Sequence, residues 1–137
     1  MPLLFVYGSL KQGFPNCHVN RGRRVAGEFV TARPHPFYLV RGGLPCLLPA
    51  DGSGLPVQGQ LFEVGPAELA EMDSLERVGQ PGGYARAEIE VLPAQGGAGG
   101  PWRAFVYLQD PALLAQPGEH IGPLAVYTAE HAGRLKW

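Results

Sequence analysis

Residues 3–16 read Leu-Leu-Phe-Val-Tyr-Gly-Ser-Leu-Lys-Gln-Gly-Phe-Pro-Asn, and the rest of the chain is best understood from this stretch. Its apolar first part, residues 3–6, is typical of a buried strand. Tyr7 ends the strand, and the turn at Gly8 and Ser9 leaves backbone N–H groups without strand partners. Such groups can bind an anionic or carbonyl oxygen. The stretch therefore predicts a strand that leads into an oxygen-binding loop.

Turn residues divide the whole chain into short segments. The 137 residues include 20 Gly and 14 Pro, yet 45% are hydrophobic, which is enough for a packed core. Apolar or alternating segments between the turns predict strands near residues 3–7, 28–32, 37–40, 44–48, 57–64, 84–92 and 102–108. Gly59 interrupts one of them and predicts close approach by a neighbouring backbone. Six or so strands joined by turns indicate an α+β fold, a small and mainly antiparallel barrel with a helix on it.

One clear helix is predicted over residues 66–77. Proline suits the first helical position, and good helix formers follow Pro66. The glycine- and proline-rich residues 79–83 then end the segment. A short helix is also expected over residues 110–116, whereas residues 12–24 and the last twenty residues carry no clear pattern.

Glu76 falls on the side of this helix that must face the core. At 100° per residue, with Leu69 at zero, Met72 lies at about 300° and Glu76 at about 340°. A glutamate in an apolar stripe is costly unless it is paired or has a task. Burial and the helix C-terminus both raise a carboxyl pKa, which suits a group that takes and returns protons. Two alternatives stay open: an ion pair with Arg86 or another arginine, or a side chain turned to water at a frayed helix end.

Asp73 lies at about 40° on the same wheel, less central than Glu76. It is expected either to support Glu76 as a neighbouring partner or to act as an ordinary helix-end residue. Lys11 and the basic residues 21–24 are expected to be solvated surface groups.

Charge and cysteine content exclude several classes of protein. Lys and Arg total 11 against 12 Asp and Glu, so the net charge of −1 gives no basic surface for nucleic acid or anionic membrane. No segment approaches the ~18 continuous apolar residues of a membrane span. Cys17 and Cys46, without a secretory signal, indicate thiols in a reducing compartment. We expect one soluble cytoplasmic domain over residues 1–137, of open oligomeric state.

The spacing of the relevant residues argues against three other kinds of site: a phosphate-binding P-loop, a serine-nucleophile site and a metal site. Gly8 and Gly13 have the spacing of a P-loop, but Phe14 and Pro15 stand where Lys-Ser/Thr is required. Ser9 as a nucleophile needs a histidine base, and the scattered histidines form no recognisable triad. Ser9 is better explained as a turn residue or a donor to substrate. The cysteines and histidines also lack metal-ligand spacing.

The order of four motifs resembles the gamma-glutamylcyclotransferase-like superfamily. These are Tyr-Gly-Ser-Leu at 7–10, Asp-Ser-Leu-Glu at 73–76, Tyr-Ala-Arg at 84–86 and Phe-Val-Tyr at 105–107. The longer pattern Tyr-Gly-Ser-Leu-Lys-x-Gly-x-Pro-Asn is most similar to the gamma-glutamylamine cyclotransferase, or AIG2-like, branch. The resemblance covers about residues 2–108 and leaves 109–137 as a C-terminal extension without an assigned role.

This resemblance implies a small mixed barrel with flanking helices and a reaction without water. In such enzymes the alpha-amine of a gamma-glutamyl amine or gamma-glutamyl amino acid attacks its own gamma-carbonyl, giving 5-oxoproline and a free amine. Glu76 corresponds to the general acid/base, and the glutamyl-binding residues correspond to Tyr7, Gly8, Ser9 and Leu10. The N–H groups of that loop are suited to the oxyanion. Two placements stay open for Tyr107: a hydroxyl at the rim of the pocket, or ordinary strand packing with the hydroxyl bonded to a neighbour. No metal or other cofactor is implied.

Two other functions stay open. The first is a non-catalytic small-molecule-binding domain of the same fold, although such a domain would be expected to lose the acid at position 76. The second is a cyclotransferase that removes a gamma-glutamyl protecting group from a biosynthetic intermediate. The leaving group is equally open among a gamma-glutamyl-lysine isopeptide, another gamma-glutamylamine and a gamma-glutamyl amino acid.

Overall fold

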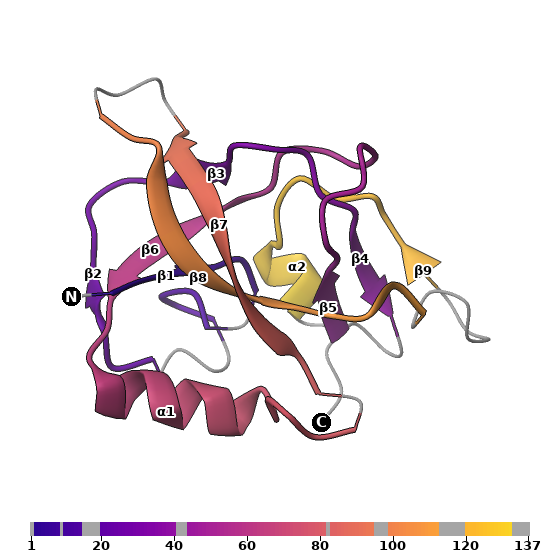
Figure 1. The fold of residues 1–137 in the computed structure, drawn as a ribbon. Coiled ribbons are helices and arrows are strands. Elements are labelled where there is room, and N and C mark those ends of the chain that lie inside the picture. Colours follow the sequence, from indigo (N-terminus) through magenta and orange to yellow (C-terminus); the bar gives the residue numbers. More distant parts are fainter. Residues whose placement is uncertain are drawn as a thin grey trace.

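The computed structural model describes residues 2–8, 10–14, 20–40, 44–81, 83–94, 99–112 and 120–132. Figure 1 shows the elements in chain order, which are β1 (Leu3–Val6), β2 (Arg23–Arg24), β3 (Phe29–Thr31), β4 (Phe37–Val40), β5 (Leu44–Leu47), β6 (Gln58–Glu63), α1 (Pro66–Leu75), β7 (Ala85–Pro93), β8 (Trp102–Leu108), β9 (His120–Ile121) and α2 (Ala129–Ala132). Neither helix in these ranges is long and apolar enough to cross a membrane.

Five strands close into a barrel. They follow the order β1-β8-β7-β3-β6, and β6 pairs back onto β1. Every pairing around this ring is antiparallel except that of β1 with β8, where Leu4 lies opposite Phe105 in parallel register. Figure 1 shows the long, twisted β7–β8 ribbon crossing the barrel, with α1 lying along one side of it. The predicted mainly antiparallel barrel with a flanking helix is confirmed.

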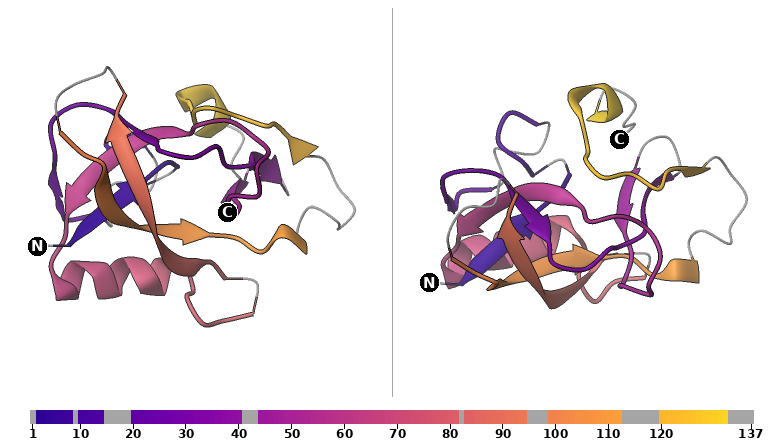
Figure 2. Two further views of the ribbon diagram at one scale, coloured as in Figure 1. Left: turned by 45° about the horizontal axis from the view of Figure 1, so that its top comes forward. Right: turned by 90° about the horizontal axis from the view of Figure 1, so that it is seen from above.

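A smaller sheet stands at the end of the barrel away from the N-terminus (Figure 2). Its strand order is β5-β4-β9, and all of its pairings are antiparallel. β9 brings part of the C-terminal segment onto β4, with Ile121 opposite Leu39. Tyr127, which follows β9, is fully buried at 0% exposure. Residues 120–127 are therefore built into the fold.

The alternation of side chains along β1 divides the core into two parts. Phe5 belongs to the cluster inside the barrel, with Leu61 and Val106. Its neighbours Leu4 and Val6 point the other way, as the period of a strand requires, into the cluster beneath α1. β1 is consequently buried on both faces, which holds the loop that follows it against α1 and the small sheet.

Gly59 confirms the predicted close backbone approach. A Cβ atom there would lie 2.4 Å from the carbonyl oxygen of Val6, so only glycine lets β6 pass β1 at this point. Of the helix expected over residues 110–116, only 110–112 lie within the described residues. β2, β9 and α2 had no expected counterpart in the sequence.

Candidate active site

Glu76 sits at the point where α1 ends. Its N–H donates to the carbonyl of Met72 at 2.9 Å, and its own carbonyl accepts the N–H of Tyr84 at 2.9 Å. The next residue, Arg77, takes a left-handed conformation with φ 56°, so the helix stops there. Leu69 and Met72 are buried on the core side of α1, as the helical wheel predicts. These contacts fix the backbone from which the Glu76 side chain projects.

The Glu76 carboxyl group lies in a poorly hydrated environment. Loss of water on burial raises its pKa to about 7 from an ordinary 4.5. Among the described residues none gives this carboxylate a hydrogen bond or an ion pair. The alternative in which Arg86 pairs with Glu76 is wrong, because Arg86 donates to Asp73 Oδ2 at 2.6 Å. The alternative of a fully solvated side chain is not borne out either, because Glu76 is only partly exposed and its carboxyl group loses water on burial.

Three tyrosines lie close to Glu76. Burial raises the pKa of Tyr7, Tyr84 and Tyr107, and the negative charge of Glu76 raises each of them further. Since that effect requires proximity, the charge of Glu76 reaches side chains from the residue after β1, from the segment before β7 and from β8. The three phenol groups thus mark the surroundings of a single carboxyl group.

Each of these phenol groups is held by an acceptor. Tyr7 donates its hydroxyl to the backbone carbonyl of Tyr107, and Tyr84 donates to the carbonyl of Pro45. Tyr107 donates to Asp73 Oδ1 at 2.7 Å. The predicted site residue Tyr107 therefore contacts the acidic residue one helical turn before Glu76. These bonds join the end of β1, β5, α1 and β8.

Gly8 brings the predicted loop to the same place. A Cβ atom on Gly8 would lie 3.1 Å from Cγ of Pro45, the residue whose carbonyl accepts the Tyr84 hydroxyl. The N–H of Lys11 donates to the Gly8 carbonyl at 3.1 Å and closes a tight turn. In the described part of the chain, no acceptor receives the N–H of Gly8 or of Leu10. Ser9 lies outside the described residues.

Asp73 and Cys46 are neighbours of the site that the sequence left without a firm role. Asp73 accepts hydrogen bonds from both Arg86 and Tyr107. The sequence signal for its place near Glu76 was its position at about 40° on the helical wheel. Cys46 of β5 is fully buried and hydrogen-bonds with the Tyr84 hydroxyl. Nothing in the local sequence distinguishes Cys46 from a core residue, since only the fold brings β5 against Tyr84.

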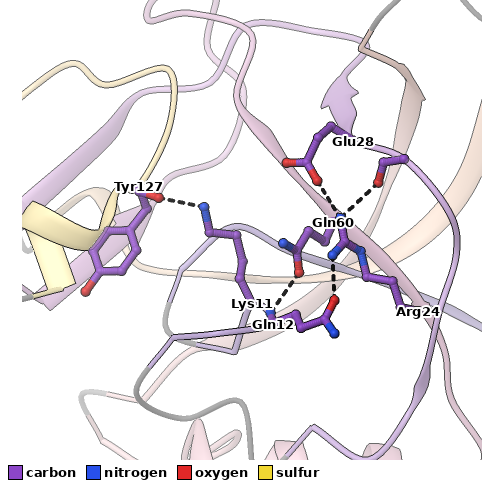
Figure 3. Close-up of polar contacts among 7 residues, drawn as sticks. Lys11, Gln12, Arg24, Glu28, Gln60 and Tyr127 are labelled. Atoms are coloured by element: carbon purple, nitrogen blue, oxygen red, sulfur yellow. Dashed lines mark hydrogen bonds and ion pairs between the residues drawn. The ribbon is translucent and has the colours of Figure 1, made fainter.

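The expectation for Lys11 is wrong. The residue is 4% exposed, and its ammonium donates to the Tyr127 carbonyl at 2.6 Å (Figure 3). The ammonium also lies 4.4 Å from the centre of the Phe14 ring. Burial lowers the Lys11 pKa. The reason is topological, because residues 10–14 pack against the segment after β9, where the Tyr127 ring also lies 5.7 Å from that of Phe14.

The basic residues that follow divide into exposed and networked groups. Arg21 and Arg23 are exposed and pair with Glu71 and Glu63, as expected for surface cations. Figure 3 shows Arg24 reaching both the Gln12 side chain and Glu28, so this arginine ties β2 to the turn after β1.

Comparisons with known proteins agree with this architecture. The family described as "Gamma-glutamyl cyclotransferase, AIG2-like" matches residues 4–128. The chain is 36% identical over 128 residues to gamma-glutamylaminecyclotransferase C of Danio rerio, covering 83% of this chain and 81% of that protein. It is 36% identical over 110 residues to gamma-glutamylaminecyclotransferase of Bos taurus, covering 76% of this chain and 63% of that protein.

A solved structure shows the same fold. The crystal structure of an AIG2-like protein from Mus musculus superposes with a TM-score of 0.71 at 30% identity, covering 87% of this chain and 86% of that one. The family match extends twenty residues beyond the stretch in which the motifs are recognisable, and it includes Tyr127. The chain belongs to the gamma-glutamyl cyclotransferase family, in its AIG2-like branch.

Proposed function

We propose that this protein is a cyclotransferase that cleaves gamma-glutamyl amines to 5-oxoproline and a free amine. The observation that carries the proposal is the Glu76 carboxyl group, unpaired within the described residues and with a pKa raised to about 7. Membership of the family and the activity named for the Danio rerio and Bos taurus relatives support the same reaction. A cytoplasmic setting and a small-molecule substrate complete the proposal.

Glu76 acts as the proton carrier in this reaction. The alpha-ammonium of the substrate gives a proton to the carboxylate, and the resulting amine attacks the gamma-carbonyl carbon to form the new ring bond. The bond between that carbon and the leaving nitrogen then breaks. The leaving amine departs as an ammonium ion, so two protons move in turn from one nitrogen to the other through Glu76. A carboxyl pKa near neutrality suits transfer in both directions.

The residues around the end of β1 bind the glutamyl part. The attack is intramolecular, so the main task of the protein is to hold a folded substrate conformer. We assign this task to Tyr7, Gly8, Ser9, Leu10 and Tyr107. The N–H groups of Gly8 and Leu10 are suited to the oxygen of the gamma-carbonyl as it gains negative charge. Tyr107 presents its ring while Asp73 holds its hydroxyl.

A substrate panel with one variant tests the proposal. Gamma-glutamyl amines and gamma-glutamyl amino acids are incubated with the protein, and 5-oxoproline is measured by mass spectrometry. Glu76→Gln should fold normally and lower kcat by at least about 100-fold. Glu71→Gln is the matched control, because Glu71 lies exposed on the same helix and forms an ion pair with Arg21. Formation of no 5-oxoproline from any substrate, or full turnover by Glu76→Gln, would refute the proposed function.

A further inference from the structure

We propose that Asp73 is a positioning residue that captures Arg86 and thereby keeps the Glu76 carboxyl group unpaired for proton transfer. The proposal rests on the function assigned to Glu76 above. It concerns three charged side chains, two on α1 and one on β7. Asp73 does not itself contact the reacting atoms in this account, and it acts through Arg86.

Both oxygens of Asp73 are occupied. Oδ2 accepts Nη1 of Arg86 at 2.6 Å, and Oδ1 accepts the Tyr107 hydroxyl at 2.7 Å. The Arg86 guanidinium also lies over the Phe105 ring, 4.9 Å from its centre. The Arg86 and Asp73 side chains are 33% and 27% exposed, so the pair is shielded from water for most of its surface. Two contacts thus hold the guanidinium on the Asp73 side.

Glu76 lies on the same side of α1 as Asp73, the residue that holds Arg86. Asp73 and Glu76 are three residues apart on α1, a spacing that places two side chains side by side on a helix. Tyr84, whose N–H donates to the Glu76 carbonyl, is two residues before Arg86, and alternate residues of an extended chain share a face. The Tyr107 hydroxyl is influenced by the charges of Asp73, Glu76 and Arg86 together. One arginine therefore stands near two carboxylates, and Asp73 holds it.

In the described part of the chain, the other titratable groups assigned to the surroundings of Glu76 are uncharged at neutral pH or exposed. Tyr7 after β1, Tyr84 before β7 and Tyr107 of β8 have pKa values raised above the ordinary value, so they stay protonated. The buried Cys46 of β5 contacts Tyr84, which in turn lies close to Glu76. Arg77, which follows Glu76 in the chain, is exposed. Asp73 and Arg86 are consequently the two charged side chains whose removal tests the proposal.

The two single changes have opposite expected signs. Asp73→Asn releases Arg86 to pair with Glu76, which lowers the Glu76 pKa by about one to three units. Arg86→Met leaves Asp73 as an uncompensated negative neighbour, which raises the Glu76 pKa by about one unit. The double variant removes both charges and should return the pKa close to that of the wild type. A purely structural role for the pair predicts no such reversal of sign.

The experiment measures the Glu76 pKa in two ways. The ¹³Cδ resonance of Glu76 is titrated by NMR in the wild type, Asp73→Asn, Arg86→Met and the double variant, with Arg21→Met as an exposed control. The acid limb of kcat/KM for 5-oxoproline release is recorded for the same proteins. Shifts of opposite sign in the single variants, with recovery in the double variant, support the proposal. Equal or absent shifts in both single variants overturn it.

Two features keep this test independent of folding and of the assigned reaction. If Asp73→Asn does not fold, the upward shift expected for Arg86→Met still decides the proposal. The NMR titration does not require turnover, so it gives a result even when no substrate is found. Full activity of Glu76→Gln would refute the proposed function and leave the electrostatic relationship to be judged by NMR alone.

Discussion

The ammonium of Lys11 donates to the backbone carbonyl of Tyr127 at 2.6 Å and so joins two segments that are 116 positions apart in the chain. Lys11 closes the tight turn that begins at Gly8, and Tyr127 lies in the segment that follows β9. Ala125 in that segment also accepts the N–H of Gln58 at 2.7 Å, and the N–H of Leu124 donates to Phe37 at 2.8 Å. The segment is thus fastened to the barrel, the small sheet and the turn after β1.

Lys11→Met should loosen the C-terminal segment. The Tyr127 carbonyl loses its donor, and a hydrogen bond of this kind contributes about 1 kcal/mol or more, equivalent to roughly fivefold to tenfold in local opening. Amide hydrogen exchange at Leu124, followed by NMR, should accelerate by that factor. Arg33→Met, at an exposed cation, should leave the exchange unchanged. Unaltered exchange in Lys11→Met would show that the ammonium does not hold the segment.

The rate of 5-oxoproline formation should fall on the acid side of neutrality. A Glu76 carboxyl with a pKa of about 7 must be ionised to accept the first proton, so kcat/KM should drop about tenfold per pH unit below that value. An ordinary glutamate would place this limb near pH 4.3. The measurement is a pH–rate profile from pH 4 to 9 in buffers of constant ionic strength. A flat profile between pH 5 and 7 contradicts a desolvated carboxylate.

Glu76→Gln should stabilise the protein at alkaline pH. Because the folded-state pKa of about 7 lies above the ordinary 4.5, the contribution of Glu76 to folding is present at low pH and is lost as pH rises through 7. The neutral glutamine avoids that loss. The free energy of unfolding of the variant should therefore exceed that of the wild type by about 2–3 kcal/mol at pH 8.5 and by almost nothing at pH 4.

Urea unfolding at both pH values measures this difference. Glu71→Gln serves again as the control, since an exposed ion-paired carboxylate should show no comparable gain. A Glu76→Gln protein that is less stable than the wild type at pH 8.5 would mean that the carboxylate is well solvated or paired.

Gly59→Ala should disrupt the barrel. The new Cβ would lie 2.4 Å from the Val6 carbonyl oxygen and 2.7 Å from Cζ of Phe5, and the first of these contacts is with backbone that cannot rotate away. We expect a loss of several kcal/mol in the free energy of unfolding, measured by thermal or urea denaturation. Gly27→Ala is the comparison, because a Cβ there meets nothing and carries only the cost of its φ of 96°. Similar stability in the two variants would refute the close approach at Gly59.

The parts of the fold that were predictable depend on local periodicity. The apolar run of β1, the alternation of β7 and the helical stripe with Leu69 and Met72 all repeat over several residues, so the barrel and α1 could be expected. β2 and β9 have two residues each, too few to carry a period. α2 has four residues and no buried side chain, so it gives no amphipathic signal either.

The candidate active site was likewise predictable only in part. The position of Glu76 inside the apolar stripe follows from the helical angle alone, and its raised pKa follows from burial. The partner of Arg86 could not be predicted in this way. Asp73 and Glu76 lie one turn apart on the same side of the helix, so their spacing is compatible with an ion pair between Arg86 and either of them. Lys11 was assigned to the surface because lysine is seldom buried, and the residue that covers it belongs to the other end of the chain.

The position of β1 in the barrel determines when, during synthesis of the chain, the candidate active site can form. Its two neighbours in the barrel are β6 and β8, and the latter reaches Leu108. The residues of the Gly8 turn are therefore synthesised early, but the barrel can hold the turn only after more than a hundred residues have been made. Catalytic activity should therefore appear only when the β-barrel closes. Turnover would then report complete folding, because no partly folded form is active.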